Sequence, residues 1–121
     1  MQEFKEIFDA YGADYESTME RFMRNEGVYL RFLDMLFQDG SLKKLGDALQ
    51  SGTMAEAFEA AHTLKGVTGN MGLTPLYTAV CRIVEPLRKG EDGEDYATLY
   101  QAVLEEFARA EKLRSSLKCA V

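Results

Sequence analysis

The sequence predicts an all-α domain, and three observations support this fold class. Apolar residues recur at intervals of three and four over most of the chain, which is the spacing of one helix face. Only two prolines occur in 121 residues, and no segment alternates strictly between apolar and polar residues as a half-buried strand would. Glycine and aspartate clusters separate the helical stretches and mark the expected turns. With 46% apolar residues, the chain can build one buried core.

Two short helices are expected at the N-terminus, at about residues 2–24. The first ends at Gly12, because glycine adopts the left-handed conformation that closes a helix, and Asp14 is positioned to cap the second. Their apolar faces consist of Phe4, Ile7, Phe8 and Tyr11 in the first helix and Met19, Phe22 and Met23 in the second.

A third helix begins after the cap residue Asn25, and a fourth, shorter helix follows the turn at residues 39–41. Both have the apolar stripe of a helix that packs on a core. The stripes consist of Tyr29, Phe32, Leu33, Leu36 and Phe37 in the third helix and Leu42, Leu45 and Leu49 in the fourth.

The fifth expected helix starts at a capping box. Thr53 and Glu56 have the spacing at which a hydroxyl and a carboxylate satisfy the free N–H groups of a helix start. The helix runs to about Met71 and closes at Gly72.

Two more helices complete the chain. Thr74 is expected as the cap of the sixth helix and Pro75 as a residue of its first turn, with Pro86 near its end. A turn at residues 89–94 leads into the last helix. Their apolar residues are Leu76, Val80, Ile83, Val84 and Leu87 in the sixth helix and Tyr96, Leu99, Val103, Phe107, Ala110, Leu113 and Leu117 in the last.

Short connections make neighbouring helices antiparallel, so the expected architecture is an antiparallel up-down four-helix bundle. The third-to-fourth helix region and the three long helices form its core, at about residues 26–118, and the N-terminal helices pack alongside. Residues 1–121 are expected to form a single domain.

Composition and charge exclude several classes of function. A net charge of −6 disfavours nucleic acid and anionic membranes as partners. Cys81 and Cys119 are the only cysteines and form no metal-binding or disulfide pattern. No apolar run resembles a signal peptide or approaches the roughly 20 residues of a membrane span. We therefore expect a cytoplasmic, monomeric protein without a bound metal or cofactor.

The strongest functional signal is the only histidine, His62, together with the residues that follow it. Gly66 and Gly69 fall inside a helix, where each costs about 0.5 to 1 kcal/mol relative to alanine. At 100° per residue, Lys65 and both glycines lie on the same stripe as His62, within an arc of roughly 100°. The core-facing arc is different and consists of Met54, Ala57, Phe58, Ala61, Leu64, Thr68 and Met71.

This stripe suits a histidine that another protein must reach. Without side chains at Gly66 and Gly69, a partner's backbone can approach the imidazole closely. Lys65 supplies a cation that can pair with phosphoryl oxygens. Phosphoryl transfer depends chiefly on alignment and charge neutralisation, so the partner can supply the metal ion.

The segment Ala61-His62-Thr63-Leu64-Lys65-Gly66, followed by Gly72-Leu73, Leu76, Cys81 and Arg88, resembles the His-x-x-Lys-Gly segment of histidine phosphotransfer (HPt) domains. The resemblance covers residues 53–90. It implies that His62 is phosphorylated, that Lys65 stabilises the phosphate, and that Gly66 is the small residue that opens the site.

The same resemblance implies the partners. In HPt domains the receiver domain of a response regulator docks over this face, with its phosphorylated aspartate and magnesium opposite the histidine. A hybrid sensor histidine kinase is the other implied partner. The expected docking surface consists of Gly66, Gly69, Phe58, Val84 and Arg88, with Val84 at a position where family members often have a polar residue.

Three functional classes remain open on the sequence. In the first, His62 accepts a phosphoryl group from a receiver aspartate and passes it to another response regulator, without independent kinase or phosphatase activity. In the second, the protein binds receivers and transfers nothing. The third is an enzyme that uses His62 as an acid or base, and it is weakest because local spacing puts no second polar group beside it. Met1 favours a free-standing protein over a domain of a hybrid kinase.

Overall fold

The computed structural model describes residues 3–91 and 93–120, which form seven α-helices and contain no strand. The all-α fold class is confirmed. Residues 1, 2, 92 and 121 lie outside the described residues. They include the two ends of the predicted domain and one position of the predicted turn at residues 89–94. The helices are α1 (Phe4–Tyr11), α2 (Tyr15–Arg21), α3 (Glu26–Gln38), α4 (Ser41–Ser51), α5 (Met54–Asn70), α6 (Thr74–Lys89) and α7 (Tyr96–Ala120).

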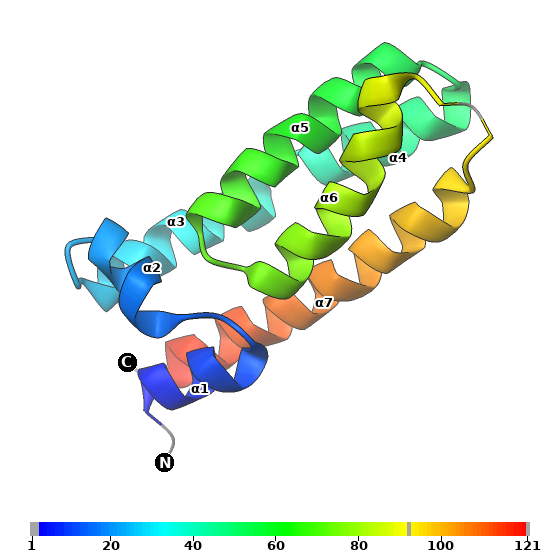
Figure 1. The fold of residues 1–121 in the computed structure, drawn as a ribbon. Helices are drawn as coiled ribbons and strands as arrows, with labels where there is room; N and C mark the ends of the chain where they lie inside the picture. The colour runs from blue at the N-terminus through cyan, green and yellow to red at the C-terminus, as the bar shows by residue number, and fades with distance from the viewer. Residues whose placement is uncertain (1–2, 92, 121) are drawn as a thin grey trace.

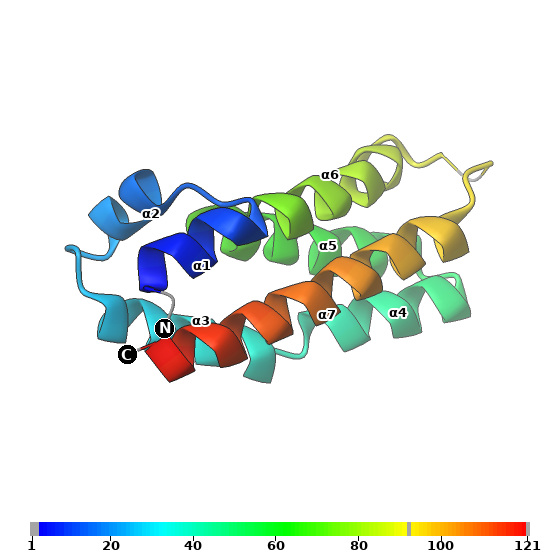
Figure 2. The same ribbon diagram turned by 90° about the horizontal axis from the view of Figure 1, so that it is seen from below.

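The long helices pack in a closed ring. α5 packs between α4 and α6, α6 packs against α7, and α7 contacts both α3 and α4 (Figures 1 and 2). α1 lies against the C-terminal part of α7, and α2 lies beyond the C-terminal end of α5. α5 is therefore held on both sides by neighbouring helices, while one of its faces stays at the surface.

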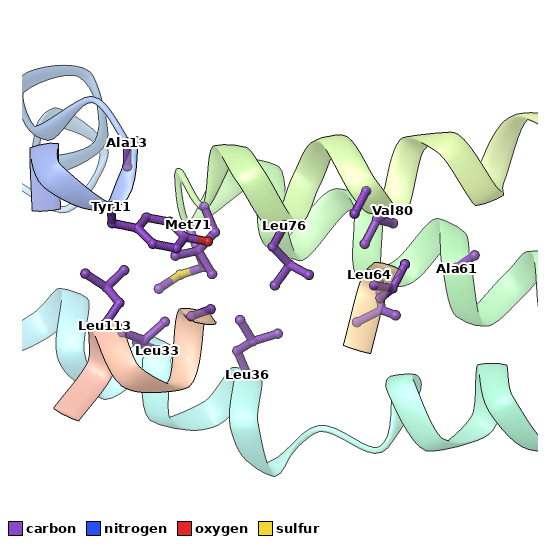
Figure 3. Close-up of a cluster of buried hydrophobic side chains, with 14 of the residues drawn as sticks. Tyr11, Ala13, Leu33, Leu36, Ala61, Leu64, Met71, Leu76, Val80 and Leu113 are labelled. Carbon is purple, nitrogen blue, oxygen red and sulfur yellow. The ribbon is translucent and has the colours of Figure 1, made fainter. Parts of the chain in front are cut away.

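The core fills the interior of this ring. Leu33 and Leu36 of α3, Leu64 of α5, Leu76 of α6 and Leu113 of α7 point toward one another (Figure 3). None of the five is more than 4% exposed. Burying each leucine stabilises the fold by about 1.5 to 3 kcal/mol, so the apolar faces predicted from spacing are the main source of stability.

Several predicted helix ends are confirmed. Gly12 has φ 109° and closes α1, and Gly72 has φ 70° just after α5. Both conformations favour glycine because a Cβ atom would be strained there. The Asn25 side chain accepts a hydrogen bond from the Val28 N–H at 3.0 Å, as expected for the cap of α3.

Asp14 and Thr53 occupy the predicted N-cap positions of α2 and α5, and their backbone carbonyls accept from the first turn of each helix. Neither side chain bonds its helix, so the predicted side-chain caps are wrong. At α2, the Tyr15 N–H donates to Asp9 instead. Thr53 has ψ 78°, short of the extended backbone that caps usually adopt, and its hydroxyl lies 2.7 Å from that of Ser51. Thr74 is the first residue of α6 and not its cap.

The second helix is shorter than predicted. It ends at Arg21, so Phe22 and Met23 lie in the turn before α3. Phe22 is buried there, whereas Met23 is 83% exposed and contributes nothing to an internal apolar face. Phe32, predicted on the internal stripe of α3, is also partly exposed.

The C-terminal end of α5 is anchored by side chains from the N-terminal half. The Tyr29 hydroxyl donates to the Met71 carbonyl at 2.8 Å in a buried position. Arg21 Nε donates to the Asn70 carbonyl at 3.0 Å. These bonds satisfy carbonyls that a helix end leaves without an intrahelical partner. Burial raises the pKa of the Tyr29 hydroxyl, which therefore remains a protonated donor.

Aromatic rings hold Tyr29 in place. The rings of Phe8 and Phe22 meet the Tyr29 ring edge to face, at centroid distances of 5.4 and 5.1 Å. Such pairs each contribute about 0.5 to 1.5 kcal/mol beyond the area they bury. Helix α1 and the turn after α2 thus fix the donor that bonds the end of α5.

The Tyr29→Phe substitution tests this anchor. It keeps the ring but leaves the buried Met71 carbonyl without its donor, so the free energy of unfolding should fall by about 1 to 3 kcal/mol in urea titrations. Tyr100→Phe is the matched control, because the Tyr100 hydroxyl donates to Leu42 in a half-buried position where water can replace it. Equal losses in the two variants would contradict a special role for Tyr29.

Candidate functional site

His62 is the central residue of the 17-residue helix α5, and its side chain is exposed. The neighbouring positions Ala61 and Leu64 are 0% and 2% exposed and face the core (Figure 3). The helical wheel therefore predicts correctly that His62 is exposed and that Ala61 and Leu64 are buried. A helix packed on both sides presents the imidazole to solvent from a rigid support.

The His62 ring does not stand alone on this surface. It is stacked on the ring of Phe58, one turn earlier, with centroids 5.6 Å apart and an angle of 21° between the planes. Phe58 is half-buried and packs against the core. The predicted core-facing position of Phe58 is therefore correct only in part. Its contact with His62 restricts the imidazole to fewer orientations than a free surface histidine has.

Lys65 lies on the same stripe as His62 and is half-buried. The ion pairs formed among residues 3–91 and 93–120 do not include it. A half-buried lysine can cover apolar surface with its stem while its ammonium group stays in water, where it can pair with an anion.

Gly66 leaves open space one turn after His62. A Cβ atom added at this position would meet nothing within 4 Å. The fold therefore does not require glycine here, although glycine inside a helix costs about 0.5 to 1 kcal/mol. Packing does not explain why this residue is a glycine, whereas access of a partner to the imidazole does.

Gly69 has a packing role that the sequence did not predict. A Cβ atom there would lie 3.0 Å from Cε1 of Tyr77 on α6, which is tighter than an ordinary contact. The small residue makes room for the Tyr77 ring and thus allows α5 and α6 to approach. The role of Gly69 in clearance for a partner stays a prediction beside this packing role.

The two docking residues expected on α6 differ from each other. Val84 is 0% exposed, so it belongs to the core and is wrong as a partner contact. Arg88 is exposed near the end of α6, where its guanidinium lies 3.4 Å from the Glu85 carboxylate. The ion pairs of the described residues join Arg88 to Glu85 and not to the His62 stripe.

Sequence reasoning missed a groove beside the stripe. It lies between α3 and α5, has a volume of about 430 Å³, and is lined by residues that include Phe32, Met35, Gly66 and Asn70. A signal existed, because Met35 falls outside the arc of Tyr29, Leu33 and Leu36 on the helical wheel of α3. An apolar residue off the core-facing arc is a candidate for a contact surface.

Among the described residues, His, Cys, Asp and Glu side chains nowhere gather in groups of three that could hold a metal ion. No helix in the same ranges is long and apolar enough to cross a membrane.

A family model described as Hpt domain matches residues 29–113, which is more than half of the chain. The chain belongs to the Hpt domain family. Hpt domains transfer phosphoryl groups in two-component phosphorelays, where they interact with receiver domains and histidine kinases and act as carriers. The match includes the whole of α5 and α6, whereas α1 and α2 precede it. Neither a curated protein nor a solved structure matches the chain.

The contrast between the two glycines of this Hpt domain can be measured. Gly66→Ala should raise the free energy of unfolding by about 0.5 to 1 kcal/mol, because it gains helix propensity in open space. Gly69→Ala gains the same propensity but must displace the Tyr77 ring, and overpacking costs roughly 1 to 3 kcal/mol, so this variant should be less stable than Gly66→Ala. Urea titration of both variants checks this, and equal stability of the two would contradict the assignment.

Proposed function

We propose that this Hpt protein accepts a phosphoryl group from a receiver aspartate on His62 and passes it to another response regulator. The observation that supports the proposal most strongly is the exposed His62 ring at the centre of α5, stacked on Phe58 and next to the open space at Gly66. Membership of the Hpt family supports the class of chemistry.

The proposal includes the family architecture. The α3–α4 segment, α5, α6 and α7 would form an antiparallel up-down four-helix bundle, with α1 and α2 packed alongside. The packing order from α4 through α5 and α6 to α7 supports it, as do the short turns between these helices. A monomeric state and a cytoplasmic location remain predictions.

The transfer needs little covalent chemistry from this chain. An imidazole nitrogen of His62 attacks phosphorus, and the N–P bond forms as the P–O bond to the receiver aspartate breaks. The aspartate carboxylate is the leaving group, and the reverse reaction loads the second receiver. Lys65 pairs with phosphoryl oxygens, while magnesium belongs to the receiver. The chain itself supplies alignment and charge and would have no kinase or phosphatase activity of its own.

Labelling of a His62→Gln variant tests this function. Purified wild-type protein mixed with phosphorylated receivers should acquire a label that is acid-labile and alkali-stable, and His62→Gln should acquire none. Glutamine preserves the helix and a polar surface, so folding should not differ. The proposal fails if no receiver labels the wild type, or if the variant is labelled equally. Equal receiver binding by wild type and His62→Ala, without transfer, would favour a pure binding module.

Phe58 provides a second test, because its ring limits how the imidazole can turn. Phe58→Leu should slow transfer at saturating receiver by roughly tenfold, since small misplacements of a reacting group reduce rates strongly. Phe58→Tyr keeps the stacked ring and should retain the wild-type rate. The transfer rates are measured by quenched flow, and thermal melts of each variant serve as the control for folding. A transfer rate of Phe58→Leu equal to that of the wild type would show that Phe58 has no role in the transfer.

A further inference from the structure

A second groove, of about 590 Å³, lies between α4 and α5, which pack side by side (Figure 1). Its walls include Lys44 of α4 and Glu59 and Thr63 of α5. At 100° per residue, Glu59 and Thr63 lie about 60° and 100° around α5 from His62, both in the same direction. Lys65 lies about 60° from His62 in the other direction. The groove and Lys65 therefore flank the imidazole on opposite sides.

Lys44 is level with His62 along this pair of helices. A turn at Gly52 and Thr53 joins α4 to α5, and Lys44 and His62 are each nine residues from Thr53, in opposite directions. Helices that pack side by side after so short a turn run in opposite directions. Residues equally far from the turn then lie at the same height, because every residue adds the same rise. The axes of packed helices are about 8 to 10 Å apart, a gap that the flexible four-carbon stem of a lysine can help to bridge.

The charge of Lys44 is not used in an ion pair within the described residues. Lys44 is exposed, and the seven ion pairs found there leave it out. Its neighbour Lys43 pairs with Asp47 at 2.8 Å, which engages the carboxylate that α4 contributes to the groove. Lys44 is the cation among the residues that line the groove, and its ammonium group can turn toward an anion at His62.

The groove also contains two carboxylates of α5. Glu56 and Glu59 are exposed and lie outside the same ion pairs, so both can attract the Lys44 ammonium group in solution. A phosphoryl group carries about two negative charges, whereas a carboxylate carries one. Phosphorylation of His62 therefore creates a stronger partner for Lys44 than either glutamate. Before phosphorylation, Lys44 offsets the field of the two carboxylates next to the imidazole.

We infer that Lys44 is a second phosphoryl-binding cation of the His62 site. Lys65 pairs with phosphoryl oxygens from one side of the imidazole, and Lys44 pairs with them from α4 on the other. Both cations neutralise charge on these oxygens while the N–P bond forms and the bond to the leaving group breaks. The inference rests on the proposed function and adds a contact from a second helix, which the His-x-x-Lys-Gly segment does not include.

Labelling of His62 by phosphoramidate, a small phosphoryl donor, tests Lys44 without a receiver. Lys44→Met removes the charge but keeps a long side chain, and the rate constant of labelling should fall by about twofold to fivefold, as for an exposed charge pair. Lys44→Arg should retain most of the rate. Lys43→Met is the matched control, because it makes the same charge change at a residue engaged with Asp47. It should label at the wild-type rate, whereas Glu59→Gln should label faster because a competing carboxylate is lost.

The phosphorus NMR signal of the labelled protein provides a readout that a purely structural role would not move. A cation beside the phosphoryl group favours its dianion and so lowers its pKa. In Lys44→Met the signal should therefore titrate at a higher pH, by roughly 0.3 to 0.7 units, which is the same twofold to fivefold effect on the pH scale. Thermal melts should not differ, because Lys44 is exposed.

A wild-type labelling rate in Lys44→Met would overturn the inference, and so would an unchanged titration of its phosphorus signal. An equal loss of rate in Lys43→Met would also overturn it, because that result would indicate a general effect of charge. Wild-type protein that phosphoramidate labels on His62 but phosphorylated receivers do not would contradict the proposed function and leave the result for Lys44 intact.

Discussion

The site depends above all on the way α5 is held. Its buried face packs into the core through Leu64 and its neighbours, and α4 and α6 flank it. Its C-terminal carbonyls are bonded by Tyr29 and Arg21 from the N-terminal half of the chain. A helix fixed in these ways cannot rotate or fray easily, so the imidazole of His62 keeps one position on the surface. For the phosphoryl transfer proposed for His62, this fixed position would provide alignment before the partner arrives.

The rest of the site is simple because the partner is expected to contribute the harder chemistry. Phe58 orients the ring from one side, Lys65 supplies a positive charge, and Gly66 leaves space. None of these residues requires a metal or cofactor on this chain.

Much of this arrangement could be predicted from the sequence, because helical spacing depends only on local geometry. Spacing alone distinguished exposed His62 from buried Leu64, and local turn chemistry identified Asn25 as a cap. The errors concern contacts between distant segments. No local pattern reveals that Gly69 makes room for Tyr77. Helical spacing puts Val84 on the apolar stripe of α6, and its burial agrees with that pattern and not with the docking role that the family resemblance implied. The Thr53 side chain lies at hydrogen-bond distance from the Ser51 hydroxyl and does not bond its own helix, and this choice of partner is not visible in the capping-box spacing.

The central claim is that the phosphoryl group must pass through His62 on its way from one receiver to another. A time course of the relay tests this most directly. A phosphorylated donor receiver, this protein and a second receiver are mixed and quenched at intervals. The account predicts that acid-labile label on His62 rises before aspartyl label appears on the second receiver, and then declines. Label that reaches the second receiver equally fast with the His62→Gln variant would contradict it.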